Sequence, residues 1–103
     1  MARQPDIHIQ RPHALGLPKA RRLAQQWMAQ ATEKYGLQFS TEEGDEGDTV
    51  RFERSGIQGT LAVRADKLDL QAELGFLFKA MGATVETEIA RKIDALLAKA
   101  STA

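Results

Sequence analysis

The sequence contains two histidines, His8 and His13, which lie close together near its start. Imidazole groups act as metal ligands and general bases, so the pair raises the question of a metal or catalytic site. A zinc site needs further converging ligands, and the chain has no cysteine and no third histidine. His8 alternates with Ile7 and Ile9, so we expect it on the strand face opposite the core. His13 follows a proline, and we expect it to bond backbone groups near a helix start. The sequence predicts no metal site and no cofactor.

The stretch EEGDEGD, residues 42–48, gathers carboxylates and raises the question of calcium. It lacks the alternating ligand positions and the distal glutamate of an EF-hand, and it is expected between strands rather than helices. We interpret it as a solvated hairpin loop. Ser40 and Ser55 lie in no nucleophile-elbow sequence, and no pattern places two carboxylates on one buried face. The sequence therefore predicts a protein that is not an enzyme.

Basic residues gather around the start of the first predicted helix, namely Arg11, Lys19, Arg21 and Arg22. Positive charge at a helix N-terminus is unfavourable against the helix macrodipole. A surface that carries such charge is interpreted either as a patch for an anionic partner or as ordinary solvated charge.

The most hydrophobic run is LGFLFKAMGA, residues 74–83. Its large apolar side chains are Phe76, Leu77, Phe78 and Met81. One helix face cannot bury all four, so some are expected to line a pocket, a dimer interface or another hydrophobic contact. We predict that Phe78 is an outward member of this group.

Hydrophobic periodicity predicts the elements that carry these residues. Residues 6–10 alternate as a short strand, and residues 18–35 form an amphipathic helix that ends at Gly36 and buries Trp27. Four alternating segments between residues 37 and 70, separated by turn formers, predict an antiparallel meander. The helical period returns towards the C-terminus, after an early helical segment in the apolar run. The predicted fold class is α+β, in the order strand, helix, four strands, helix, with two helices covering one face of the sheet.

Composition limits the class of protein. The 103 residues fit a single domain, residues 1–103, with frayed ends at 1–5 and 100–103. The N-terminus lacks a signal peptide and no stretch is long enough for a membrane span, so we expect a soluble cytoplasmic protein. Basic and acidic residues balance at 14 each. Nucleic-acid binders usually have a pI above about 9, whereas this chain has a pI near 6.7. Nucleic acid is not an expected partner.

Several ordered motifs resemble one family, the polyhydroxyalkanoic acid system family. They are DIHIQRPHALGLPKAR, Trp27 in the first helix, RSGIQGTLAV, and LGFLFKAMGATVETEIARKIDALLAK. The resemblance runs from about residue 6 to residue 99. Members are small bacterial proteins encoded beside genes for making and using polyhydroxyalkanoate, and some are associated with storage granules. The family supplies no active-site residues. The element order is also similar to a shortened Bet v1-like (START-like) domain that lacks two strands, a likeness of fold alone.

The resemblance implies a non-enzymatic accessory protein of polyhydroxyalkanoate metabolism. It would bind the granule surface, or a granule protein, through Phe76, Leu77, Phe78 and Met81 together with the final helix. A homodimer built on the same run is a further expectation. The alternative is a small carrier of an apolar or acyl ligand, held between the sheet and the C-terminal helix.

Overall fold

A computed structural model describes residues 5–102, with side chains for residues 5–100. The elements, in chain order, are β1 (Ile7–Pro12), α1 (Leu17–Tyr35), β2 (Gln38–Glu43), β3 (Gly47–Arg54), β4 (Ile57–Arg64), β5 (Lys67–Leu74), α2 (Phe76–Lys79) and α3 (Gly82–Thr102). This order agrees with the predicted one, and the apolar run supplies the short additional helix α2. Frayed ends were predicted at residues 1–5 and 100–103. Residues 1–4 and 103 lie outside the described residues, and α3 extends through Thr102.

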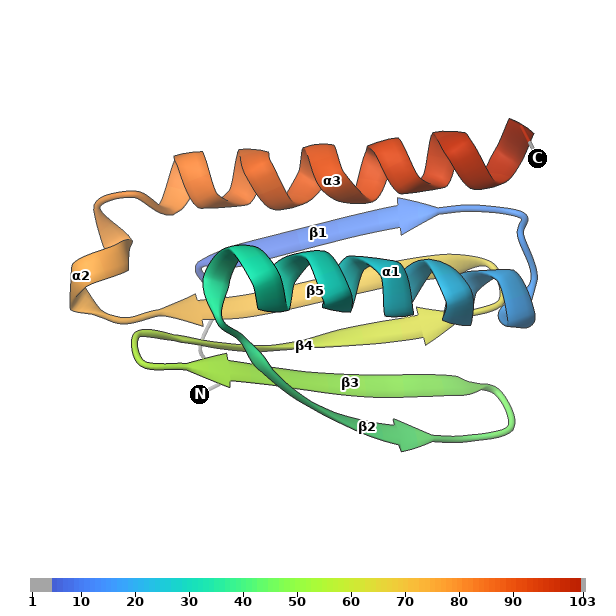
Figure 1. The fold of residues 1–103 in the computed structure, drawn as a ribbon, viewed down its shortest axis with the longest axis horizontal. Helices are drawn as coiled ribbons and strands as arrows, with labels where there is room; N and C mark the ends of the chain where they lie inside the picture. Colours follow the sequence, from blue (N-terminus) through green and yellow to red (C-terminus); the bar gives the residue numbers. More distant parts are fainter. Residues whose placement is uncertain (1–4, 103) are drawn as a thin grey trace.

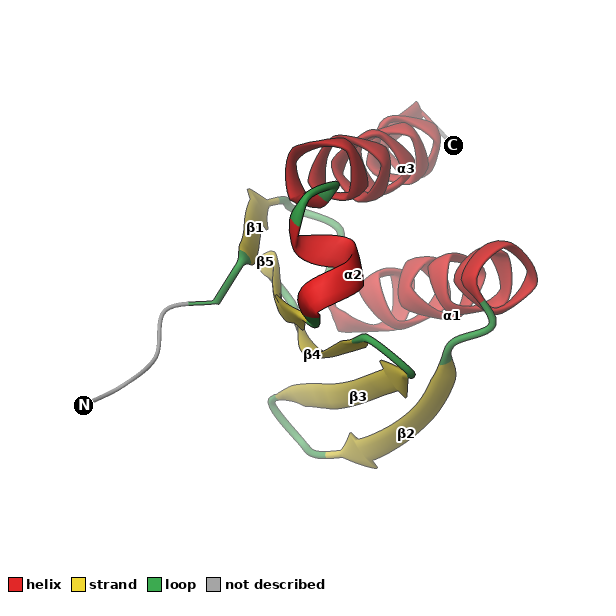
Figure 2. Ribbon diagram, turned by 90° about the vertical axis from the view of Figure 1, so that its left-hand side faces the viewer, coloured by secondary structure: helices red, strands yellow, loops and turns green. Residues whose placement is uncertain are grey.

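The five strands form one antiparallel sheet in the order β1-β5-β4-β3-β2. Strands β2 to β5 are the predicted meander, because each pairs with the next along the chain. Strand β1 pairs with β5, with Ile9 opposite Leu70, so the first and last strands lie side by side. Both long helices lie on the same face of this sheet (Figures 1 and 2). The prediction of an α+β fold with one covered sheet face is confirmed.

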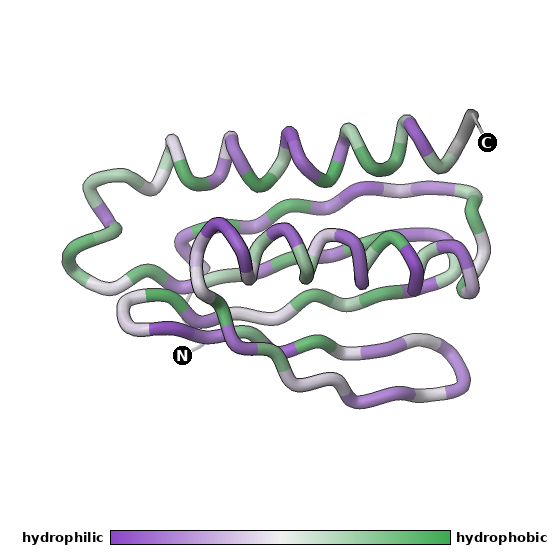
Figure 3. Tube along the Cα trace, viewed as in Figure 1, coloured by the Kyte–Doolittle hydropathy of each residue, from purple (hydrophilic) through white to green (hydrophobic). Residues whose placement is uncertain are grey.

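The core lies between that sheet face and the two long helices. Trp27 and Leu23 of α1 and Ile93 of α3 are buried there, against inward strand residues such as Leu70. Figure 3 shows the hydrophobic positions of α3 on the side that faces the sheet. Alternation along each strand leaves the other sheet face polar. The same alternation therefore defines a buried face and an open face of the sheet.

Candidate functional site

Exposed apolar side chains gather at one end of the molecule. Within the described part of the chain, the large hydrophobic residues that are exposed are Phe76 (92%), Leu77 (82%) and Met81 (52%). All three come from α2 and its link to α3, at the end of the sheet where β5 stops (Figure 1). The same segment forms a hydrophobic stretch in Figure 3. We call these three side chains the apolar tip.

Backbone hydrogen bonds hold the segment that carries the apolar tip. The N–H of Gly75 donates to the carbonyl of Gly56 at 2.7 Å, which ties the end of β5 to the turn between β3 and β4. The N–H groups of Phe78 and Lys79 both donate to the Gly75 carbonyl at 3.0 Å. These bonds therefore hold the single turn of α2 next to the edge of the core.

Phe78 points inward, so the prediction that it is an outward member was wrong. Its side chain is partly buried and packs against the core. The ring lies on Gly56, where an added Cβ would come within 2.7 Å of it, and the φ of +90° at Gly56 also favours glycine. The guanidinium carbon of Arg54 lies 5.4 Å from the ring centroid on Phe78. Consecutive residues of a helical turn point in different directions, so burying Phe78 leaves Phe76 and Leu77 outside.

Arg54 connects the apolar tip to the first long helix. It donates from Nη1 to the carbonyl of Tyr35 at 2.7 Å, at the C-terminal end of α1. Cations are favourable at helix C-termini, where carbonyl groups lack helical partners. Arg54 and Lys79 also line a surface depression beside Phe76. The tip therefore has a basic and polar border.

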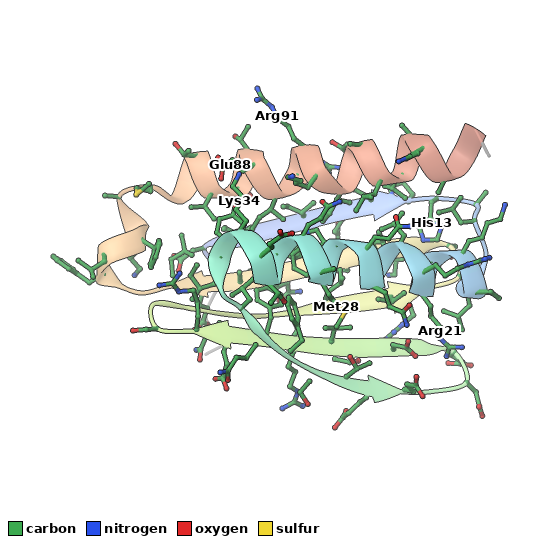
Figure 4. The ribbon with its side chains drawn as sticks, in the orientation of Figure 1. His13, Arg21, Met28, Lys34, Glu88 and Arg91 are labelled. Carbon is green, nitrogen blue, oxygen red and sulfur yellow. The ribbon has the colours of Figure 1, made fainter. Side chains whose placement is uncertain are left out.

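A second contact joins the long helices near the same end. The Tyr35 hydroxyl donates to Glu88 Oε2 at 2.7 Å, and Lys34 Nζ lies 3.4 Å from Glu88 Oε1 (Figure 4). The hydrogen bond from Tyr35, together with the charge of Lys34, lowers the pKa of Glu88. Burial and the bond to Glu88 raise the pKa of Tyr35. At neutral pH the contact therefore holds a charged carboxylate and a neutral phenol between α1 and α3.

The predicted basic cluster does not form one free patch. Arg21 binds Asp48 with both Nε and Nη2 at 3.0 Å, and Nη2 also donates to the Gly44 carbonyl at 2.8 Å. Arg11 Nε donates to Asp94 at 2.7 Å, which links β1 to α3. Two of the four basic groups are therefore used inside the fold. The anionic-partner interpretation stays a prediction and rests on the two exposed residues, Lys19 and Arg22.

Arg21 is expected to act on stability, whereas Arg22 is not. Removing Arg21 leaves the buried carboxylate of Asp48 without its bidentate partner. It also removes the hydrogen bond to the Gly44 carbonyl in the turn between β2 and β3. We expect Arg21→Ala to lower the urea midpoint of unfolding clearly, and Arg22→Ala, its exposed neighbour, to leave it unchanged. Circular dichroism during urea titration measures both. Equal midpoints for the two variants would contradict a structural role for Arg21.

The two histidines lie in different surroundings, as expected. His8 is on the open face of the sheet, where Nε2 lies 3.0 Å from Asp69 Oδ1. Desolvation opposes the charge of Asp69, but hydrogen bonds from Gln10 and His8 outweigh it and lower the pKa of this carboxyl. His13 Nδ1 accepts the N–H of Leu15 at 3.1 Å, so it bonds backbone near the start of α1. Over residues 5–100, no three histidine, aspartate or glutamate side chains are grouped to hold a metal ion.

The sequence interpretation missed two features of the site. Arg54 received no role, because its partners Phe78 and Tyr35 are distant in sequence. No role was predicted for the open face of the sheet either, although the polar residues out of phase with the strand hydrophobics could have indicated one.

The fold and the site define a small α+β protein with exposed apolar side chains at one end of its sheet. Residues 7–97 match the family of polyhydroxyalkanoic acid system proteins, and the chain belongs to this family. The description of the family names no enzyme activity. Comparisons with curated proteins and with solved structures gave no match, so the likeness to Bet v1-like domains stays a prediction. No described helix has the length and apolar composition needed to cross a bilayer.

Proposed function

We propose that this protein is a non-enzymatic accessory protein of polyhydroxyalkanoate metabolism that binds the surface of the storage granule in the cytoplasm. Its contact is the apolar tip, with Phe78 as the internal support. The observation that carries the proposal is the exposure of Phe76, Leu77 and Met81 on a segment that backbone hydrogen bonds hold next to the core. The family supports a role in the polymer system.

The size of the apolar tip favours adsorption to a surface. Its exposed area is on the order of 400 Å². Removing that area from water contributes up to roughly 10 kcal/mol, and the loss of free motion on association offsets part of it. A hydrophobic polyester surface accepts the side chains without needing a matching shape, as lipid does for interfacial helices. Reversible binding is the expected result.

A homodimer through the same tip is less well supported. Stable protein interfaces usually bury about 800 Å² on each partner, roughly twice what the tip offers. The carrier alternative would need room between the sheet and α3. Side chains of one buried cluster, including Leu70 of β5 and Ile93 of α3, occupy that layer. Granule binding is therefore the function that the geometry supports best.

The test is co-sedimentation with granules that have been stripped of their own proteins. The variant Phe76→Asp/Leu77→Asp places two charges on the exposed tip and should keep the fold. The matched control is Gln25→Asp/Gln26→Asp, which adds the same charge at two adjacent exposed positions of α1. We expect the tip variant to bind at least about tenfold more weakly, and the control to bind like the parent.

Light scattering and circular dichroism accompany the test. A tip variant that keeps the parent's fold and still co-sediments equally well would disprove the proposal. A parent that is dimeric, with a monomeric tip variant, would assign the tip to self-association instead. Binding to native granules but not to stripped ones would assign it to a granule protein.

A further inference from the structure

The open face of the sheet carries a continuous row of hydrogen-bonding side chains. The strand registers place Ser40 opposite Arg51, Arg51 opposite Thr60, and Thr60 opposite Gln71. Directly opposed residues of antiparallel strands project from the same face. All four are exposed, and Arg51, Thr60 and Gln71 alternate with buried strand residues, so the four lie on the open face of the sheet. Figure 2 shows that α1 and α3 lie on the other side of the sheet. We call these four residues the polar row; it crosses β2, β3, β4 and β5.

Most of the polar row has unused hydrogen-bonding capacity. Among the described residues, the side chains of Ser40, Arg51 and Thr60 have no hydrogen-bond or ion-pair partner, whereas Gln71 bonds Asp69. All four line one surface depression. A guanidinium group only donates hydrogen bonds, and hydroxyl and amide groups both donate and accept them. The row therefore suits a ligand that presents several acceptors.

The charges around the polar row disfavour an anionic ligand. The neighbouring rows on the same face carry carboxylates, with Glu53 and Glu73 on one side and Glu42 and Asp69 on the other. Arg51 is the charged member of the row itself. A free carboxylate placed along the row would meet negative charge on both sides. An uncharged chain of acceptors carries no net charge for these carboxylates to repel.

The spacing of the row matches a repeating ester. Adjacent strands lie about 4.7–4.9 Å apart, so the row offers hydrogen-bonding groups at about that interval. A 3-hydroxyalkanoate polyester repeats every four backbone bonds, which advance about 4.5–5 Å in an extended chain. Each repeat presents one ester carbonyl that accepts hydrogen bonds and no group that donates them. A chain lying across the strands would thus bring one ester to each strand.

The polar row is also connected to the apolar tip. The depression along the row and the depression beside Phe76 share two lining residues, Gln58 and Glu73. A polymer segment that leaves a surface in contact with the tip could therefore continue onto the open face.

We propose that the polar row binds a short, uncharged stretch of hydroxyalkanoate polyester, laid across strands β2 to β5 with successive ester carbonyls accepting from Ser40, Arg51, Thr60 and Gln71. This inference rests on the proposed function for the chemical class of its ligand. It concerns a different surface from the apolar tip, so the two can be tested separately.

The experiment uses the whole chain and a soluble probe. The probe is a tetramer of 3-hydroxybutyrate, acetylated at its hydroxyl end and methyl-esterified at its acid end, so that it carries no charge. Titration is followed by ¹H–¹⁵N NMR. We expect saturable shifts at the amides of the polar row, and the apparent Kd should rise about tenfold in Arg51→Leu/Thr60→Val, which removes two donors. The control Arg91→Leu, on the exposed side of α3 (Figure 4), should bind like the parent.

Further arms separate this proposal from granule binding by the tip. The variant Phe76→Asp/Leu77→Asp should keep the shifts at the polar row even if it no longer binds granules. The same tetramer with a free acid end should bind no more tightly than the capped one. Shifts confined to α2, an absence of saturable shifts, or equal affinity in Arg51→Leu/Thr60→Val would each overturn the inference, whatever the granule experiment shows.

Discussion

Replacing Trp27 by alanine is expected to lower the free energy of unfolding by about 3–5 kcal/mol. Only 3% of the Trp27 surface is exposed. Its ring meets Phe39 and Phe52 edge to face, with centroid distances of 5.8 Å and 5.6 Å. Such aromatic pairs contribute beyond the area they bury. The loss is a large share of the roughly 5–15 kcal/mol that stabilises a domain.

Urea unfolding followed by far-ultraviolet circular dichroism measures the effect without the tryptophan signal. The control is Gln26→Ala, one position earlier on the exposed side of α1, which should move the midpoint little. Trp27→Phe should lie between the two, since it keeps part of the aromatic cluster. If Trp27→Ala and Gln26→Ala unfold at the same urea concentration, the packing of α1 on the sheet is not as described.

The burial of Trp27 could be predicted from sequence because its signal is local and periodic. Leu23, Trp27 and Ala31 recur at helical spacing, and all three are buried in the structure. The strands could equally be predicted, since alternating hydrophobic residues and flanking turn formers mark each one. Pairing within the meander followed from the short connections, which allow only antiparallel neighbours.

Contacts between residues that are distant in sequence could not be predicted from the sequence. The residues around Arg21 predict a basic helix start, but its partner Asp48 follows 27 positions later in a different element. Arg11 and Asp94 are 83 positions apart. Nothing local distinguishes a paired arginine from a free one, because charge patterning reports composition and not partners. The four basic residues were therefore predicted as one cluster. In the structure, Arg11 and Arg21 bind carboxylates, whereas Lys19 and Arg22 are exposed.

The apolar run failed to predict orientation for another reason. Phe76, Leu77 and Phe78 are consecutive, so they contain no period that would assign a buried side. Their directions are set by Gly75, which bonds the β3–β4 turn and so directs the third of these residues, Phe78, towards Gly56. The polar row depends in the same way on the register of four strands, which the strand patterns alone leave open.

Replacing Phe78 by alanine is expected to lower the free energy of unfolding, whereas replacing its neighbour Leu77 is expected to change it little. Phe78→Ala removes the ring that packs on Gly56 and contacts the guanidinium group of Arg54. Full burial of a phenylalanine would make this change cost about 3–5 kcal/mol; for a partly buried ring we expect about 2 kcal/mol. Leu77→Ala changes an exposed side chain and should alter the free energy of unfolding by less than about 0.5 kcal/mol.

Amide hydrogen exchange locates the difference. The N–H groups of Phe78 and Lys79 bond the Gly75 carbonyl, and that of Met81 bonds the Phe78 carbonyl. In Phe78→Ala these three positions should exchange faster, because α2 loses its attachment to the core. In Leu77→Ala they should exchange as in the parent, while granule binding weakens. Unchanged exchange and stability in Phe78→Ala would show that Phe78 does not anchor α2, and the apolar tip would then lack the support that its geometry requires.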